Sequence, residues 1–293
     1  MPGWNEIQNE LINCTEPQQI LDIQNDYTQK LSNYTKRNTI RYYSNFLNIN
    51  SGDISINDND MTGFMNAVHQ CDRKKGLDLI LHTPGGSPTA AESIVKYLKK
   101  SFKNNIRVIV PHIAMSAGTM IACSSKEIIM GNHSSLGPID PQFNGIPAYN
   151  IQAEFDEAEK DLESFPEKAQ FWAIRLQQYP AAFLKTAIDA IELSSSLLEE
   201  WLGDAMYKAE EDNEQIKNIV KALNEHTASL VHDRHYDIDK CREIGLKVTQ
   251  LEEDSELQDK VLSVHHSTLI SMNMLSMSKM ISNESSGYFV KTN

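Results

Sequence analysis

Two short apolar runs, each followed by a turn of small residues, constrain the fold of this chain most strongly. They are "LDLILHT" at 77–83 and "RVIV" at 107–110, and a helix-forming segment, "TAAESIVKYLKKSF" at 89–102, separates them. A third round of helix and strand follows in "TMIACSSKEIIMGN" at 119–132. Short apolar strands that alternate with helices indicate a parallel sheet with right-handed crossovers. The sequence therefore predicts an α/β fold with a largely parallel sheet.

The segments on either side of this alternation have a mostly helical pattern. Residues 1–35 are polar and amphipathic, and "NTIRYYSNFLN" at 38–48 predicts a first strand. A helix that ends at Gly245 and a last amphipathic helix over 256–280 are expected near the C-terminus. We divide the chain into an N-terminal helical segment (1–45), a core with the candidate site (46–150), a helical block (151–231), a segment that completes the core (232–280) and a disordered tail (281–293).

Charge and cysteine usage exclude several classes of protein. The chain of 293 residues carries 40 acidic and 27 basic side chains, which argues against nucleic acid or an anionic membrane surface as a partner. No apolar run reaches the roughly 18 residues of a membrane span, and no signal peptide is apparent, so we expect a cytoplasmic protein without a transmembrane helix. The four cysteines form no CxxC pair, which argues against disulfides and a zinc site, and we expect no cofactor.

The turns that follow the two apolar runs carry the candidate chemistry. "PGG" contains Gly85 and Gly86, and "MSAG" contains Ser116 and Ala117. A tight turn and a helix N-cap would explain each motif alone. Together they would lie at the carboxyl edge of a parallel sheet, where α/β proteins bind ligands. They offer a nucleophile and backbone N–H donors for an oxyanion, which is what amide hydrolysis requires.

The combination of these motifs resembles the Clp-fold serine peptidases, which include the caseinolytic Clp peptidases and the signal-peptide peptidase A group. The resemblance is strongest to the serine dehydrogenase proteinase family, whose members carry "TPGG", "MSAGT" and "S-x-LGPIDPQ" segments like those in 75–143. It weakens through the helical block and returns near "HDRHYDIDKCREIGLKV" at 232–248. The resemblance implies a Clp/crotonase-type spiral of ββα units with a helical insertion. It also implies that Ser116 is the nucleophile and that Gly85, Gly86 and Ala117 surround the oxyanion hole.

The resemblance also suggests a base for Ser116. In the Clp peptidases a histidine follows the serine along the chain and an aspartate comes later. Here Asp140 stands at the first position, in "GPIDPQ", and His235 stands at the second, in "DRHYD". The serine dehydrogenase proteinases are described as having this altered order. We therefore assign His235 as general base and Asp140 as the residue that orients it, because a triad is defined by geometry and not by chain order.

Other assignments stay open at this point. Asp140 before a proline is ordinary turn chemistry, and His235 could be a surface residue. His266, a polar residue on an apolar helix, is the rival base. A Ser–Lys dyad of the signal-peptide peptidase A type would draw on Lys160 or Lys168, which lie in charged helix.

The leading hypothesis is a serine endopeptidase that acts on peptides or unfolded proteins through an acyl-enzyme. A crotonase-like thioester enzyme and a non-catalytic assembly protein are the alternatives. No nicotinamide fingerprint is present. We expect a homo-oligomer, because the helical block carries more apolar residues than one sheet face can cover. These residues are Phe155, Leu162, Phe165, Phe171, Trp172, Ile174, Leu176, Phe183, Leu184, Ile188, Ile191, Leu197, Leu198, Trp201 and Leu202.

Overall fold

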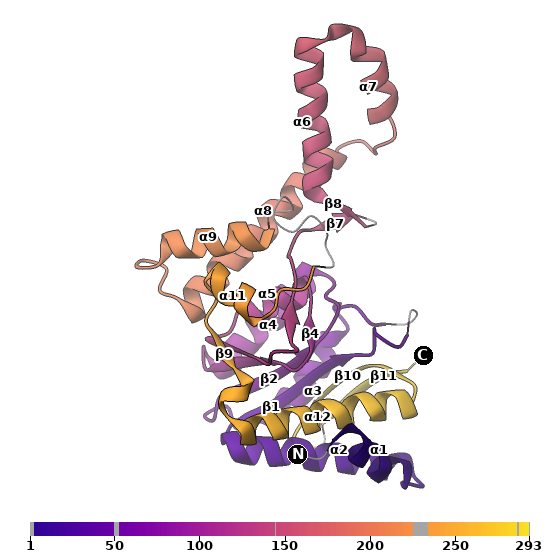
Figure 1. Ribbon diagram of the computed structural model, residues 1–293, viewed down its shortest axis with the longest axis vertical. Coiled ribbons are helices and arrows are strands. Elements are labelled where there is room, and N and C mark those ends of the chain that lie inside the picture. Colours follow the sequence, from indigo (N-terminus) through magenta and orange to yellow (C-terminus); the bar gives the residue numbers. More distant parts are fainter. Residues whose placement is uncertain (1–2, 50–52, 144, 225–233, 286, 293) are drawn as a thin grey trace.

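The computed structural model describes residues 3–49, 53–143, 145–224, 234–285 and 287–292 (Figure 1). In these residues seven strands form one sheet in the order β11-β10-β1-β2-β3-β5-β9. The five strands from β1 to β9 run parallel, and β10 and β11 join antiparallel at one edge, which confirms the predicted α/β fold with a largely parallel sheet. The strands are β1 (Asn38–Ser44), β2 (Leu77–His82), β3 (Ile106–Val110), β5 (Glu127–Met130), β9 (Val248–Gln250), β10 (Met277–Asn283) and β11 (Tyr288–Thr292).

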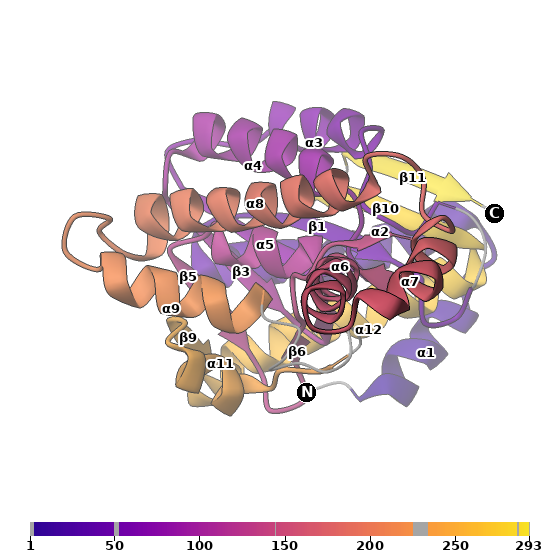
Figure 2. The same cartoon turned by 90° about the horizontal axis from the view of Figure 1, so that it is seen from above.

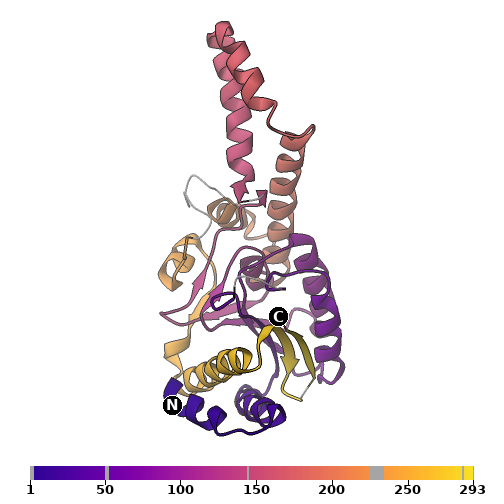
Figure 3. The same cartoon turned by 90° about the vertical axis from the view of Figure 1, so that its right-hand side faces the viewer.

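Helices cover both faces of this sheet (Figures 1 and 3). In β2, Leu79 and Leu81 point into the core beneath α3, α4 and α5, whereas Ile80 points into the core beneath α2 and α12. Because both faces are covered, the middle of β2 (79–81) and the end of β3 (108–110) are continuous apolar runs that do not alternate with polar residues. The helices of these layers are α1 (Trp4–Ile12), α2 (Pro17–Thr35), α3 (Asp60–His69), α4 (Pro88–Phe102), α5 (Ala117–Cys123), α11 (Ile238–Ile244) and α12 (Ser255–Met274).

The C-terminal segment differs from the sequence-based expectation. The predicted helix over 256–280 ends at Met274, and residues 277–283 form β10 beside β1. The predicted disordered tail over 281–293 contains the end of β10 and all of β11, so that prediction is wrong. The reason is tertiary: the local pattern places Lys279 on a helix surface, but in the fold it is fully buried against Asp60, which is 219 positions away in the chain.

The helical block divides into a packed part and a projecting part. Trp201 and Leu198 on α8 (Phe183–Trp201) are buried in the main core, and α8 runs over the body on the α5 side (Figure 2). Helix α9 (Asn213–Asn224) also packs on the core. By contrast, α6 (Ala148–Ser164) and α7 (Ala169–Leu176) rise away from the body with the start of α8 (Figures 1 and 3). Among the described residues, no helix has the length and hydropathy that a membrane span needs.

Candidate active site

Ser116 stands on the sharp turn between β4 (Ile113–Ala114) and α5. Its φ of 51° and ψ of −117° lie in a region that few residues other than glycine adopt. The turn is held by hydrogen bonds from the Met115 N–H to the Thr83 carbonyl (3.0 Å) and from the Gly118 N–H to the Met115 carbonyl (2.7 Å). A serine held in strained backbone between a strand and a helix is the geometry in which many hydrolases present their nucleophile.

Thr119 ties this turn to the neighbouring chain. Its hydroxyl oxygen lies 2.9 Å from the Ala114 carbonyl and 3.0 Å from the Gly137 carbonyl, and it accepts a hydrogen bond of 3.0 Å from the Gly137 N–H. Thr119 is fully buried. The motifs did not single out Thr119, although its place directly after "MSAG" is a signal that points to it.

The two positions in "PGG" require glycine because other parts of the chain approach each of them closely. A Cβ on Gly85 (φ 96°) would lie 2.6 Å from the Met115 carbonyl oxygen and 2.8 Å from the Ser116 Cβ. A Cβ on Gly86 (φ 151°) would lie 2.4 Å from both the N and the O of Ile56. Both positions combine positive φ with lack of space, so only glycine fits. The Gly85 turn therefore packs directly against the serine turn, as the parallel-sheet argument predicted.

Two of the three predicted oxyanion donors are unpaired. The Gly85 N–H donates to the Thr83 hydroxyl at 3.2 Å. The N–H groups of Gly86 and Ala117 have no hydrogen-bond partner within the described part of the chain. A pair of free backbone N–H groups beside a serine is the arrangement that stabilises a tetrahedral oxyanion.

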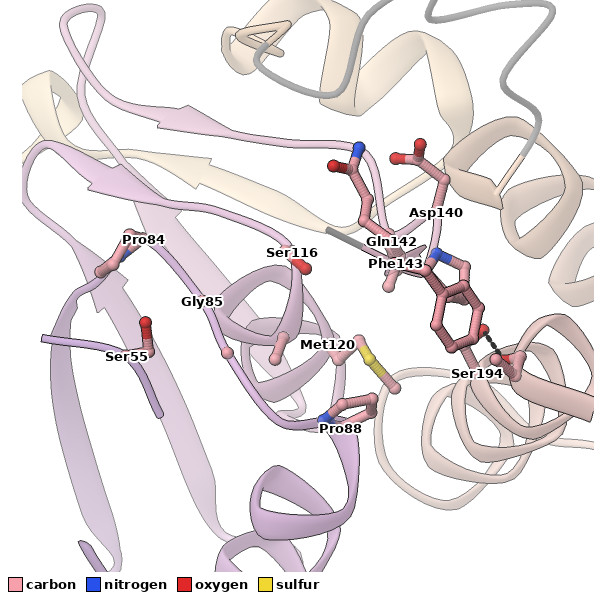
Figure 4. Close-up of a pocket in the computed structure, with 15 residues that line it drawn as sticks. Ser55, Pro84, Gly85, Pro88, Ser116, Met120, Asp140, Gln142, Phe143 and Ser194 are labelled. Carbon is pink, nitrogen blue, oxygen red and sulfur yellow. Dashed lines mark hydrogen bonds between the residues drawn. The ribbon is translucent and has the colours of Figure 1, made fainter. Parts of the chain in front are cut away.

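A cavity of about 370 Å³ lies in front of Ser116 (Figure 4). Asp140 stands on the opposite wall from Ser116 and is 1% exposed. Its charge adds to the effect of burial in raising the pKa of the Tyr236 hydroxyl. The rest of the lining is mainly apolar and includes Pro84, Pro88, Met120, Ile139, Pro141, Phe143 and Ala190.

His235 does not line this cavity. It is exposed, and its Nδ1 lies 2.7 Å from the hydroxyl oxygen of Ser135. Ser135 is on β6 (Ser135–Leu136), the strand that pairs with β4 just before Ser116. The structure thus brings Ser116, Asp140 and the glycine turn together at the cavity, and it places His235 beside Ser135 of β6, outside the cavity lining. Ser135 is a further residue that the sequence analysis did not single out.

The rival bases lie elsewhere. His266 is on α12, on the opposite face of the sheet from α5, with its ring 5.4 Å from the Trp4 ring. Lys160 is exposed on α6, and Lys168 pairs with Asp161 at 2.9 Å; neither lysine lines the cavity. His226 and His232, in the helical block and just beyond it, lie outside the described residues.

Three further histidines form a cluster on the α12 side of the sheet. The ring of His82 lies 5.6 Å from that of His112 and 5.4 Å from that of His265. Burial, together with the neighbouring His112, lowers the pKa of His82 to about 3. Burial also lowers the pKa of His112 and holds that of His265 well below its ordinary range. These rings are therefore uncharged at neutral pH, and they pack against one another on the α12 side of the sheet.

This cluster predicts a loss of stability on mild acidification. The folded-state pKa of His82 is below its ordinary value of 6.5, so the unfolded chain binds a proton that the folded chain does not. The stability that the neutral ring provides is present above that value and is lost as the pH falls toward 3. From pH 7 to about pH 5.5, His82 alone should cost about 1 kcal/mol. Urea unfolding of the wild type and of His82→Gln at both pH values measures this. An equal loss in both proteins would contradict it.

Comparison with known proteins places the chain in a family. The family model described as "ClpP-like SDH-type serine proteinase" matches residues 51–260. Two uncharacterized proteins of Methanocaldococcus jannaschii are 34% and 31% identical to this chain over 190 and 189 residues, each match covering 64% of the chain. These matches span 59% and 57% of the relatives' own lengths. A solved structure of a mutant membrane-bound stomatin-specific protease, 1510-N, aligns with a TM-score of 0.42 and 17% identity over 70% of this chain and 79% of that one.

Proposed function

Because the chain belongs to the ClpP-like SDH-type serine proteinases, which have the Clp-type fold, we propose that it is an endopeptidase that cleaves peptide bonds through an acyl-enzyme on Ser116. One observation carries the proposal. The strained Ser116 turn lies at the same cavity as the N–H groups of Gly86 and Ala117, for which the described residues supply no hydrogen-bond partner. The apolar lining of that cavity suits a peptide side chain.

In the proposed reaction, the Ser116 hydroxyl oxygen attacks the scissile carbonyl carbon, and its proton passes to His235. The carbonyl oxygen, on which negative charge develops, accepts hydrogen bonds from the N–H groups of Gly86 and Ala117. His235 then donates the proton to the leaving amine, and a water molecule repeats the sequence to release the acyl group. His235 does not line the cavity, and catalytic hydrogen bonds often tighten only when substrate binds, so the proposed proton transfer requires His235 to approach Ser116 in the substrate complex.

The contact with Ser135 supports His235 as the base because it favours one tautomer of the imidazole ring. If the Nδ1–H of His235 donates to the Ser135 hydroxyl oxygen 2.7 Å away, the lone pair is left on Nε2, where a base needs it. Asp140 would stabilise the imidazolium that forms, as the acidic member of a triad does.

The pH dependence of hydrolysis tests the choice of base. An imidazole base gives a rate that rises through the neutral range and then levels off, and this is the profile we expect on a short fluorogenic peptide. A stopped assay in buffers from about pH 5 to pH 10 gives the profile. A rate that rises only well above neutral would replace His235 by a lysine.

We also propose that the chain assembles into a homo-oligomer. The projecting helices α6 and α7 leave Phe165, Phe171 and Ile174 48%, 57% and 58% exposed, whereas Trp172 between them is buried. Clustered apolar exposure of this kind marks a protein interface. Light scattering coupled to size exclusion should therefore give a mass that is a multiple of 33.1 kDa. A single species at the monomer mass would contradict the proposal.

A further inference from the structure

A fully buried lysine lies beneath the loop that borders the cavity. Lys279, on β10, is 0% exposed. Its Nζ donates to Asp60 at 2.8 Å, to Asp53 at 3.0 Å and to the backbone carbonyl of Ser55 at 2.7 Å. All three N–H bonds of the ammonium group are therefore used by oxygen atoms. A charge buried this completely is costly unless it is paired, so the contacts constrain both Lys279 and its partners.

Asp60 extends this network to two more parts of the chain. It is 0% exposed, and its second carboxylate oxygen accepts hydrogen bonds from the Tyr42 hydroxyl (2.8 Å) and from the Asn57 N–H (3.0 Å). The Asn57 side chain donates to Asp53, which also accepts a hydrogen bond from Lys279. Strands β1 and β10 and the start of α3 thus hold the segment 53–57 at three of its five residues.

The held segment in turn fixes the glycine turn. The Ile56 N–H donates to the Gly85 carbonyl at 2.8 Å, and the Ser87 N–H donates to the Ile56 carbonyl at 2.9 Å. These two bonds flank Gly86, and the Ile56 backbone approaches it so closely that no Cβ could be added. Ser55, whose carbonyl binds Lys279, lines the cavity itself. The direction of the Gly86 N–H is therefore set by the position of Ile56.

We propose that Lys279 is a positioning residue for the oxyanion hole. With Asp60 and Asp53 it holds the segment 53–57, and through Ile56 it aims the Gly86 N–H at the cavity. The role of Gly86 as an oxyanion donor rests on the proposed function. The mechanical link from Lys279 to Ile56 and Gly86 does not, so the two can be tested separately.

Lys279 does not act as the base in this proposal. Its Nζ donates to two carboxylates and a backbone carbonyl, and it makes no hydrogen bond to Ser116 among the described residues. Its effect on the reaction passes through the backbone of the segment 53–57.

The test uses a double variant, Lys279→Met with Asp60→Asn. Lys279→Met alone would leave a buried carboxylate without its partner and could unfold the protein. The double variant removes both charges and keeps the side-chain volumes similar. The matched control is Asp78→Asn with Arg107→Met, at the end of β2 away from the glycine turn, where Arg107 binds Asp78 at 2.8 Å. Asp78 also binds Arg37 at 2.6 Å, so the control leaves Arg37 without its carboxylate, much as the double variant leaves Asp53 without Lys279.

The first measurement is independent of activity. Hydrogen–deuterium exchange of the full-length protein reports the protection of the Ile56 and Ser87 amides, which make the two bonds that flank Gly86. We expect exchange at these two amides to accelerate about tenfold or more in the double variant and to stay at the wild-type rate in the control. Unchanged protection at both amides in the folded double variant would overturn the inference.

The second measurement is steady-state hydrolysis of a fluorogenic peptide. We expect kcat to fall by about 10- to 100-fold with little change in KM, since loss of a whole oxyanion donor costs about 10²- to 10³-fold. The control should keep the wild-type kcat at a temperature where it is folded. Faster exchange with an unchanged kcat would overturn the catalytic part of the inference. If the wild type itself hydrolyses no peptide, the proposed function fails, and the exchange result alone decides the mechanical link.

Discussion

Replacing Ser116 by alanine should abolish peptide hydrolysis while leaving the fold intact. The substitution removes one oxygen atom from a half-buried turn, and alanine at a φ of 51° is no more strained than serine. Without the nucleophile, no acyl-enzyme forms, and the loss should be on the order of 10⁵-fold or more. Hydrolysis of casein and of a short fluorogenic peptide measures the rate, and the thermal unfolding midpoint checks the fold.

The matched control for this variant is Ser194→Ala. Ser194 lines the same cavity, but its hydroxyl donates to the Ala190 carbonyl at 2.8 Å within α8. This variant should keep most of the wild-type rate. Full activity in Ser116→Ala would show that the nucleophile lies elsewhere.

Replacing His235 by alanine should lower the rate by about 10⁴-fold, as removal of a triad member usually does. His266→Ala should cost much less, because His266 packs against Trp4 on the other face of the sheet. Peptide hydrolysis by the two variants, purified side by side, gives the ranking. The opposite ranking would move the base to His266 and leave Asp140 without the partner that the proposal gives it.

The central α/β pattern could be predicted because local sequence determines it. The strands "LDLILH" and "IRVIV" are apolar on both faces, and the helices between them begin and end at recognisable residues, such as Ser87 before α4. Strand β10 could not be predicted in the same way. Its polar positions are buried only because Asp60 and the neighbouring strands supply partners from far along the chain.

In the candidate site too, some contacts follow from local sequence and others depend on distant parts of the chain. The meeting of Gly85, Gly86 and Ser116 follows from parallel strands whose carboxyl ends share one edge. The close approach of Ile56 to Gly86 could not be anticipated, because "DISIN" at 53–57 carries no signal for the contact. The hydrogen bond between Ser135 and His235 likewise joins segments 100 positions apart through the pairing of β6. The motifs thus predicted that the serine and glycine turns meet, but not the contacts that orient them.

Covalent labelling with a fluorophosphonate probe tests the central claim most directly. Such a probe phosphonylates a serine only where a base and an oxyanion hole activate it. The probe is added to the wild type and to Ser116→Ala, intact mass spectrometry counts the adducts, and peptide mapping locates them. The account predicts one adduct per wild-type chain, on Ser116, and none on Ser116→Ala. A folded wild type that takes up no probe, or that carries the adduct on another serine, would contradict it.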